Sequence, residues 1–126
     1  MNKTIINTLM AAVFSASLGF ASSNAIAGRD FYQEKLIQNL QQSKQKLEKA
    51  KLAQGMQQQN LINEHSKMLH DNMEMCRSMK PKAIMTEQER NEWYVEHQKI
   101  MDLMMEQMME KEKIMMSSTY CEAHKK

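Results

Sequence analysis

Residues 78–89 read Ser-Met-Lys-Pro-Lys-Ala-Ile-Met-Thr-Glu-Gln-Glu, and this stretch separates two long helical patterns in a chain of 126 residues. Pro81 has no backbone donor and disfavours helix at the residue before it, so a helix should end here. Thr86 and Glu89 have the spacing of a capping box, in which each side chain accepts from the backbone N–H of the other residue. The stretch therefore predicts a break followed by a clean helix start near residue 86.

Before this break, residues 30–79 carry a stripe of mostly apolar positions spaced three and four apart. The stripe comprises Ile37, Leu40, Leu47, Leu61, His65, Met68, Met75 and Met79. Such spacing is typical of a coiled-coil helix, but the middle of the stripe is polar. Gly55 lies in that middle, where it costs about 1 kcal/mol relative to Ala in a helix. We expect one long helix with a kink near Gly55, and the Gln/Lys-rich residues 28–60 have the composition of a flexible segment.

After the break, a second helix is expected to run to about Met116, with residues 117–126 forming a tail. Its stripe comprises Trp93, His97, Met101 (or Ile100), Met104, Met105, Met108 and Met115. Two long helices joined by a short break predict an all-α fold, an antiparallel helical hairpin with little tertiary core. A turn centred near residues 82–83 would place Met68 opposite His97, and His65 opposite Ile100 and Met101.

Composition excludes several classes of protein. The 3 glycines and 1 proline are too few for the tight turns of a β-sandwich or barrel. A net charge of +2 with interspersed signs indicates no nucleic-acid surface. The chain has no Gly-rich phosphate loop, nucleophile elbow or His-Glu-x-x-His motif, so no enzyme is predicted.

The first 27 residues have the order of parts found in a secretory signal peptide. Lys3 gives the N-terminal region a positive charge, and residues 5–20 are mostly apolar. Ala25-Ile26-Ala27 has the small-x-small pattern of a signal-peptidase cleavage site. The apolar run is shorter than the roughly 20 residues of a membrane-spanning helix. We expect cleavage after Ala27, a single domain of residues 28–126 without a membrane anchor, and a location in the periplasm of a Gram-negative-type bacterium.

Methionine is concentrated in one part of the chain, since 12 of the 15 methionines fall between residues 68 and 116. Two pairs have the form His-x-x-Met, and His97 precedes Met101 by four residues, so each pair lies side by side on a helix. Thioether and imidazole ligands together suit Cu(I) or Ag(I). A thioether forms no disulfide in an oxidising compartment, which favours it over a thiolate in an exported protein. The alternative is that methionine simply fills the core or an adaptable binding surface.

The metal hypothesis names ten ligands. The first set is His65, Met68, His97 and Met101 across the hairpin, and the second is Met104, Met105, Met108 and Met109, with His70 and Met73 as a further pair. Trp93 is interpreted as the packing anchor of the hairpin, with a cation–π cap over a metal at His97 and Met101 as the alternative.

Cys76 and Cys121 are the two cysteines. In a simple hairpin they lie about 45 Å apart, far beyond the reach of a disulfide. This favours free or intermolecular cysteines over an intramolecular bridge, and Cys76 can also serve as a soft ligand beside Met73 and Met75.

The His-x-x-Met pairs and the methionine block of residues 101–109 resemble the Met/His-rich periplasmic copper and silver resistance proteins of the SilE/PcoE type. The resemblance covers residues 64–116 and implies sequestration of soft metal by segments that gain helix on binding. A second, local resemblance links residues 85–90, Met-Thr-Glu-Gln-Glu-Arg, to the Leu-Thr-x-x-Gln-Arg motif of the Spy/CpxP group of periplasmic helical proteins.

The sequence thus predicts a periplasmic protein that sequesters or delivers Cu(I) or Ag(I). The alternative is a Spy/CpxP-like chaperone or interaction module that uses a Met-rich apolar face and binds no metal. The expected partners are a metal ion and either a second copy of the chain or another periplasmic protein.

Overall fold

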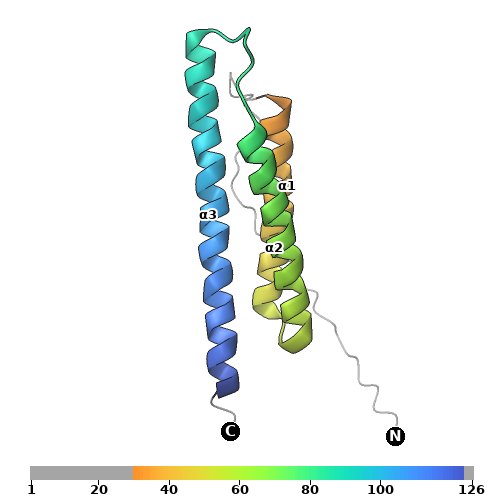
Figure 1. Cartoon of the computed structure of the whole chain (residues 1–126). Helices are drawn as coiled ribbons and strands as arrows, with labels where there is room; N and C mark the ends of the chain where they lie inside the picture. Colours follow the sequence, from red (N-terminus) through yellow and green to blue (C-terminus); the bar gives the residue numbers. More distant parts are fainter. Residues whose placement is uncertain (1–29, 124–126) are drawn as a thin grey trace, which may run out of the picture.

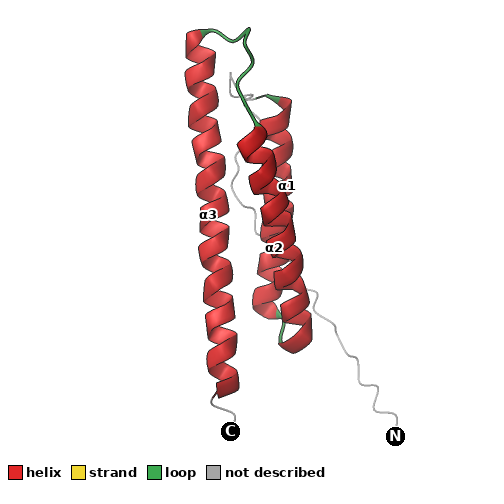
Figure 2. Cartoon of the chain, viewed as in Figure 1, coloured by secondary structure: helices red, strands yellow, loops and turns green. Residues whose placement is uncertain are grey.

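The structure is a computed structural model that describes residues 30–123, and for residues 120–123 it describes the backbone alone. The predicted signal peptide and residues 124–126 lie outside the described residues. Within them the chain forms three helices and no strand: α1 (Phe31–Leu52), α2 (Gly55–Ser78) and α3 (Glu87–Ala123) (Figure 2). The all-α class is confirmed.

The expected kink near Gly55 is a full reversal of the chain. Ala53 and Gln54 alone join α1 to α2, and Gly55 adopts a left-handed φ of 59°. Glycine takes this conformation without the steric cost that a Cβ imposes. The two helices therefore run antiparallel and pack against each other along their length, and the prediction of a two-helix hairpin is wrong (Figure 1). The molecule is a three-helix bundle in which the Gln/Lys-rich segment is helical from Phe31 onward.

One backbone N–H and one side-chain amide satisfy carbonyl groups in the last turn of α1 at the reversal. The Ala53 N–H reaches the carbonyls of Lys49 and Ala50, and the Gln58 side chain donates to the Ala50 carbonyl at 2.9 Å. The last carbonyls of α1 thus find partners inside the turn. An ion pair between Lys46 and Glu64 joins the two helices nearby.

The buried face of α3 is formed mainly by residues next to its methionines, not by the methionines themselves. The buried residues of this helix are Trp93, Glu96, Ile100, Met104, Gln107 and Ile114. In α2 they are Ile62, His65, Leu69, Asn72 and Cys76. The expected stripes are therefore offset by about one residue at most positions, so that Ile100 is buried and Met101 is exposed. Most of the α3 methionines flank the core.

The core consists of two apolar clusters with a polar contact between them. One cluster includes Leu36, Leu40, Leu69, Cys76, Ile100 and Met104, and the other includes Leu47, Ala50, Ile62 and Ile114. Between them the Gln107 amide nitrogen donates to the Leu40 carbonyl at 3.0 Å, and its oxygen lies 3.1 Å from His65 Nε2. Because the Gln107 oxygen can only accept, His65 must carry its proton on Nε2.

The start of α3 follows the capping box predicted from the sequence. The Thr86 N–H donates to the Glu89 carboxylate at 2.8 Å, and the Glu89 N–H donates to the Thr86 hydroxyl at 3.2 Å. The predicted end near Met116 is wrong, since α3 continues to Ala123. The hydroxyls of Ser117 and Ser118 donate to the carbonyl of Ile114, and this back-bonding lets them stay helical instead of capping.

The linker from α2 to α3 changes the register of the two helices. The backbone is extended at Met79, and the chain runs past the end of α2 and turns at residues 83 and 84 before α3 begins (Figure 1). As a result Cys76 lies opposite His97, and His65 lies opposite Gln107. The expected pairing of Met68 with His97 and of His65 with Met101 is wrong by about two helical turns. Pro81 is the physical reason, because it favours an extended residue before it where a tight turn was assumed.

None of the helices within residues 30–123 is long and apolar enough to cross a membrane.

Candidate soft-metal site between α2 and α3

A pocket of about 170 Å³ opens between α2 and α3, and most of its lining side chains contain sulfur. From α2 it is lined by Met73, Cys76 and Arg77, and from α3 by His97, Met101, Met104, Met105 and Met108. The spacing of the α3 residues places them on one face of that helix over three turns. Six thioether or thiol sulfurs and one imidazole therefore share one hollow.

Cys76 and His97 make the closest polar contact in this pocket. The Cys76 sulfur lies 3.5 Å from His97 Nε2 and 3.9 Å from Nδ1. Cys76 carries a free thiol and is buried, whereas His97 is half-buried. The thiol proton can be shared with the imidazole, so in the absence of metal the two groups satisfy each other.

Burial keeps both of these groups neutral. Desolvation raises the pKa of the Cys76 thiol above its ordinary value. Desolvation also lowers the pKa of His97, against a smaller opposing effect from Asp30. The pair is therefore thiol and imidazole, not the thiolate–imidazolium pair of an activated cysteine nucleophile. A neutral imidazole is the form that binds metal ions.

The His97 ring is held in place by its stacking on Trp93. It stacks on Trp93 with ring centroids 4.7 Å apart and planes inclined by 13°. Trp93 is itself buried, and its indole N–H donates to Asp30 at 3.1 Å, while the Gln33 side chain donates to its carbonyl at 3.0 Å. The packing role predicted for Trp93 agrees with this arrangement, which also orients His97.

Six of the ten ligands predicted from the sequence line this pocket: Met73, His97, Met101, Met104, Met105 and Met108. The other four do not. His65 is fully buried in the core against Gln107, and Met68 is half-buried on α2 outside the pocket. His70 and Met109 are exposed, and neither lines the pocket.

Two residues of the pocket were absent from the predicted ligand set. Cys76 belongs there because Ile62, His65, Leu69, Asn72 and Cys76 form one buried stripe, which the expected register missed. Arg77 follows it in sequence and lies at the pocket's edge. A stripe traced backward from Cys76 at three- and four-residue steps would have found this face of α2.

Among the side chains of residues 30–119, which the structure describes, no three of His, Cys, Asp or Glu converge to hold a metal ion. Any metal held in the pocket must therefore use thioether ligands beside Cys76 and His97. This donor set is soft, and it disfavours the hard ions Mg²⁺ and Ca²⁺.

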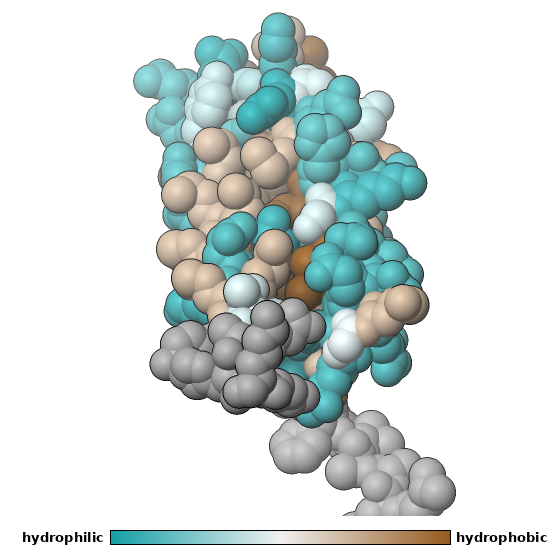
Figure 3. Space-filling view, turned by 60° about the horizontal axis from the view of Figure 1, so that its bottom comes forward, coloured by the Kyte–Doolittle hydropathy of each residue, from teal (hydrophilic) through white to brown (hydrophobic). Residues whose placement is uncertain are grey.

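Several methionines of α3 are exposed to solvent. Met109 and Met116, which do not line the pocket, are 59 and 64% exposed, and Met105, which lines it, is 58% exposed. Figure 3 shows a pale brown area of moderate hydropathy on the side where α3 lies, bordered by hydrophilic atoms. Methionine on α3 is thus mainly a surface residue. The interpretation as core filler holds for Met104, and for Met73 and Met75 of α2 and Met79 directly after it, which pack against the core.

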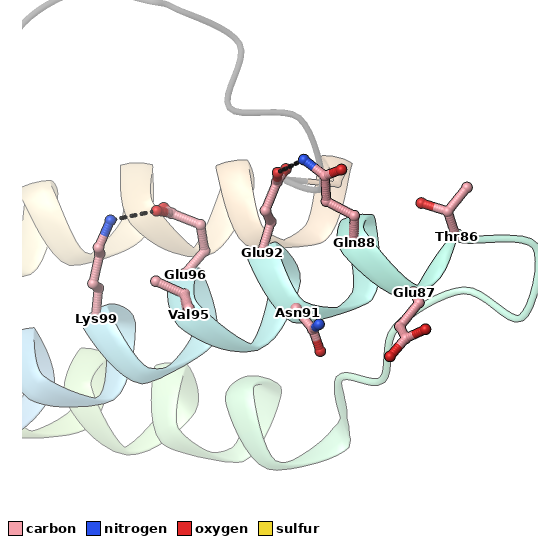
Figure 4. Close-up of a pocket in the computed structure, with 8 residues that line it drawn as sticks. All are labelled: Thr86, Glu87, Gln88, Asn91, Glu92, Val95, Glu96 and Lys99. Atoms are coloured by element: carbon pink, nitrogen blue, oxygen red, sulfur yellow. Dashed lines mark hydrogen bonds and ion pairs between the residues drawn. The ribbon is translucent and has the colours of Figure 1, made fainter.

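A second hollow of about 790 Å³ follows the first turns of α3. It is shallow and is lined by Thr86, Glu87, Gln88, Asn91, Glu92, Val95, Glu96 and Lys99 (Figure 4). Lys99 pairs with Glu96 at 2.7 Å, and Gln88 donates to Glu92 at 3.0 Å. It contains no sulfur and no imidazole, so it does not extend the soft-metal site.

Compared with known proteins, the chain matches no protein-family model, no curated protein and no solved structure.

Proposed function

We propose that this protein binds Cu(I) or Ag(I) in the periplasm, for sequestration or delivery, through the pocket between α2 and α3. One observation carries the proposal: Met73 from one helix meets His97, Met101, Met104, Met105 and Met108 from another around a small cavity. These residues are far apart in the sequence, and packing alone does not require so many sulfur atoms at one place.

The chemistry of the pocket supports a soft, singly charged ion. Thioethers are neutral ligands that need no deprotonation, and burial keeps His97 in its neutral form. The periplasmic location follows from the signal peptide expected in residues 1–27. In that compartment a thioether keeps its ligand capacity where exposed thiolates oxidise.

A competition titration tests the proposal. The purified protein is titrated anaerobically with Cu(I) against a chromophoric chelator, and we expect it to withdraw Cu(I) with an affinity better than micromolar. Replacing Met101, Met104, Met105 and Met108 together with Leu preserves volume and apolar character but removes the thioethers, so binding should weaken severely.

The matched control replaces Met109 and Met116 with Leu. Both are exposed methionines of α3 that do not line the pocket, so this variant should bind like the parent protein. Equal weakening in the control would argue against a localised site. Absence of binding better than micromolar in the parent protein would overturn the proposal.

The exposed methionines favour a second candidate function, an adaptable surface for apolar segments of other proteins. Flexible thioether side chains adapt to varied partners, and three of those on α3 are more than half exposed. An aggregation-suppression assay with the fourfold Leu variant separates the two functions, because Leu retains the apolar surface and loses the metal. Full chaperone activity in a protein that binds no metal would favour this second function.

A further inference from the structure

We propose that Cys76 is the anionic ligand of this site, so that one Cu(I) is held between α2 and α3 by the Cys76 thiolate, the His97 imidazole and a thioether of the pocket. This inference rests on the proposed function and deepens it. It replaces a set of neutral thioethers with a mixed site that has one charged ligand and bridges two helices.

The separation of the two key atoms fits a shared metal ion. Sulfur at about 2.3 Å and nitrogen at about 2.0 Å from a tetrahedral ion, as on zinc, lie about 3.5 Å apart. The Cys76 sulfur and His97 Nε2 lie 3.5 Å apart. An ion can enter between them with little movement of the backbone of either helix.

The surroundings of Cys76 supply the remaining ligands. Met73 lies on the same helix three residues earlier, and Met101 lies on α3 one turn after His97, and both line the pocket. Trp93 stacks on the His97 ring and limits its rotation. The imidazole is therefore already oriented before metal arrives, which lowers the entropic cost of binding.

The charges of the bound state balance within the pocket. As Cu(I) binds, the S–H bond breaks, the proton leaves to solvent and a Cu–S bond forms, so that the metal stays in its +1 state and no electron is transferred. The thiolate neutralises the ion, and the two can share a pocket in which Cys76 is only 3% exposed.

A competing explanation is that Cys76 is a small apolar residue of the core, since it belongs to the cluster around Leu69 and Ile100. The two explanations differ in what Cys76→Ser does. The substitution keeps the size of the side chain but removes the soft anionic ligand, whereas a packing role would leave metal binding unchanged.

The experiment uses the purified protein carrying Cys121→Ser, which leaves Cys76 as its one thiol. Cu(I) is added anaerobically, and the near-ultraviolet charge-transfer absorption of a thiolate–Cu(I) bond is followed together with affinity by chelator competition. We expect an absorption that saturates at one equivalent. Adding Cys76→Ser should abolish it and weaken affinity by at least about tenfold, since even outer-shell partners of a metal are worth that much.

Matched histidine variants test the second ligand. His97→Gln should weaken binding, and His70→Gln, at an exposed histidine of α2 outside the pocket, should not. Far-ultraviolet circular dichroism of each metal-free variant shows whether it is folded, and Cys76→Ala replaces Cys76→Ser if the serine variant is not.

The outcomes separate this inference from the proposed function. If Cu(I) binds tightly without the charge-transfer absorption, or equally tightly to Cys76→Ser, the inference is overturned while soft-metal binding by thioethers stands. If the parent protein fails to compete for Cu(I), both are overturned.

Discussion

At the scale of single residues, Asp30 joins two helices that are distant in sequence. The Asp30 carboxylate caps α1 by accepting from the Gln33 N–H at 2.9 Å, and it also accepts from the indole of Trp93 on α3. One side chain thus serves a local and a long-range role. The local role is visible in the sequence, whereas the long-range role depends on α3 lying beside α1.

Replacing Asp30 with Ala should therefore cost more than the loss of an ordinary helix cap. A lost N-cap costs about 1 kcal/mol, and the buried indole N–H loses its partner as well, so we expect about 2 kcal/mol in the free energy of unfolding. Urea denaturation followed by circular dichroism measures it. Asp30→Asn keeps one acceptor oxygen, so it can satisfy only one of the two donors and should recover only part of the loss; full recovery in this variant would contradict the double role.

His65 makes stability depend on pH. Desolvation by burial lowers its pKa below the ordinary value of 6.5, against a smaller opposing effect of the hydrogen bond with Gln107. Below pH 6.5 the unfolded chain therefore binds a proton more readily than the folded one. Stability should be full above this pH and should fall as the pH drops through the folded-state pKa.

Thermal unfolding between pH 7.5 and 5 tests this pH dependence. His65→Gln keeps a donor toward Gln107 and cannot titrate, so its melting temperature should change less with pH than that of the parent. His70→Gln, at an exposed position, should leave the slope unchanged. His97 contributes in the same direction, so some slope should remain in His65→Gln. A pH-independent parent would show that burial of these imidazoles is not coupled to folding.

At the scale of elements, the reversal at Gly55 determines how many helices the bundle has. A Cβ placed on Gly55 would meet nothing within 4 Å, so the position requires glycine for its φ of 59° alone. Gly55→Ala should cost about 1 to 2 kcal/mol, the penalty of a left-handed conformation. The same change favours a continuous helix from α1 into α2, which exposes both apolar faces.

Chemical denaturation and size-exclusion chromatography together examine this prediction. We expect lower stability, and an elution earlier than that of the parent if opened chains exchange helices. The control is Ala at Gln57, an exposed helical position two residues later, which should be neutral or slightly stabilising. Unchanged stability in Gly55→Ala would mean that the turn tolerates a side chain.

The length of α3 also limits which disulfide bonds the two cysteines can form. Because α3 is one continuous helix to Ala123, the backbone of residue 121 lies 24 residues beyond His97, or about 36 Å. Cys76 lies beside His97, so an intramolecular bridge to Cys121 does not fit this bundle. This agrees with the prediction of free or intermolecular cysteines, although the side chain of Cys121 lies outside the described residues.

At the scale of the whole molecule, the proposed site lies across the weakest packing of the bundle. The helices α1 and α2 pack more closely on each other than α3 packs on either. An ion bound to Cys76 and His97 would hold α3 to α2. Metal binding should then stabilise the complete fold, not only the pocket.

The expected gain follows from mass action. At a free Cu(I) concentration about 100 times Kd, unfolding should become about 2.7 kcal/mol more costly if the unfolded chain does not bind. Differential scanning calorimetry under anaerobic conditions should show a higher Tm with Cu(I), and little change in the fourfold Leu variant. If Cu(I) does not change the Tm of the parent protein, the metal binds the folded and the unfolded chain equally well.

The sequence by itself determined the class of fold and the start of α3. The signals for both are local: a composition that favours helix, the break at Pro81, and the capping box of Thr86 and Glu89. Each depends on hydrogen bonds and conformational preferences within a few residues, so distant residues are not needed to form it. The clustering of methionine and six of the eight side chains that line the pocket could also be identified from spacing in the sequence.

The tertiary structure alone decided the number of helices, the register of α2 against α3 and the place of Cys76 beside His97. Gly55 in a helical pattern is compatible with a kink or with a reversal, and the choice depends on whether α1 and α2 bury their apolar faces against each other. The register depends on an extended linker and on the buried contact of His65 with Gln107, two long-range features that spacing in the sequence does not contain. The physical reason is that packing free energy is shared among distant residues, whereas caps and breaks act within a few residues of themselves.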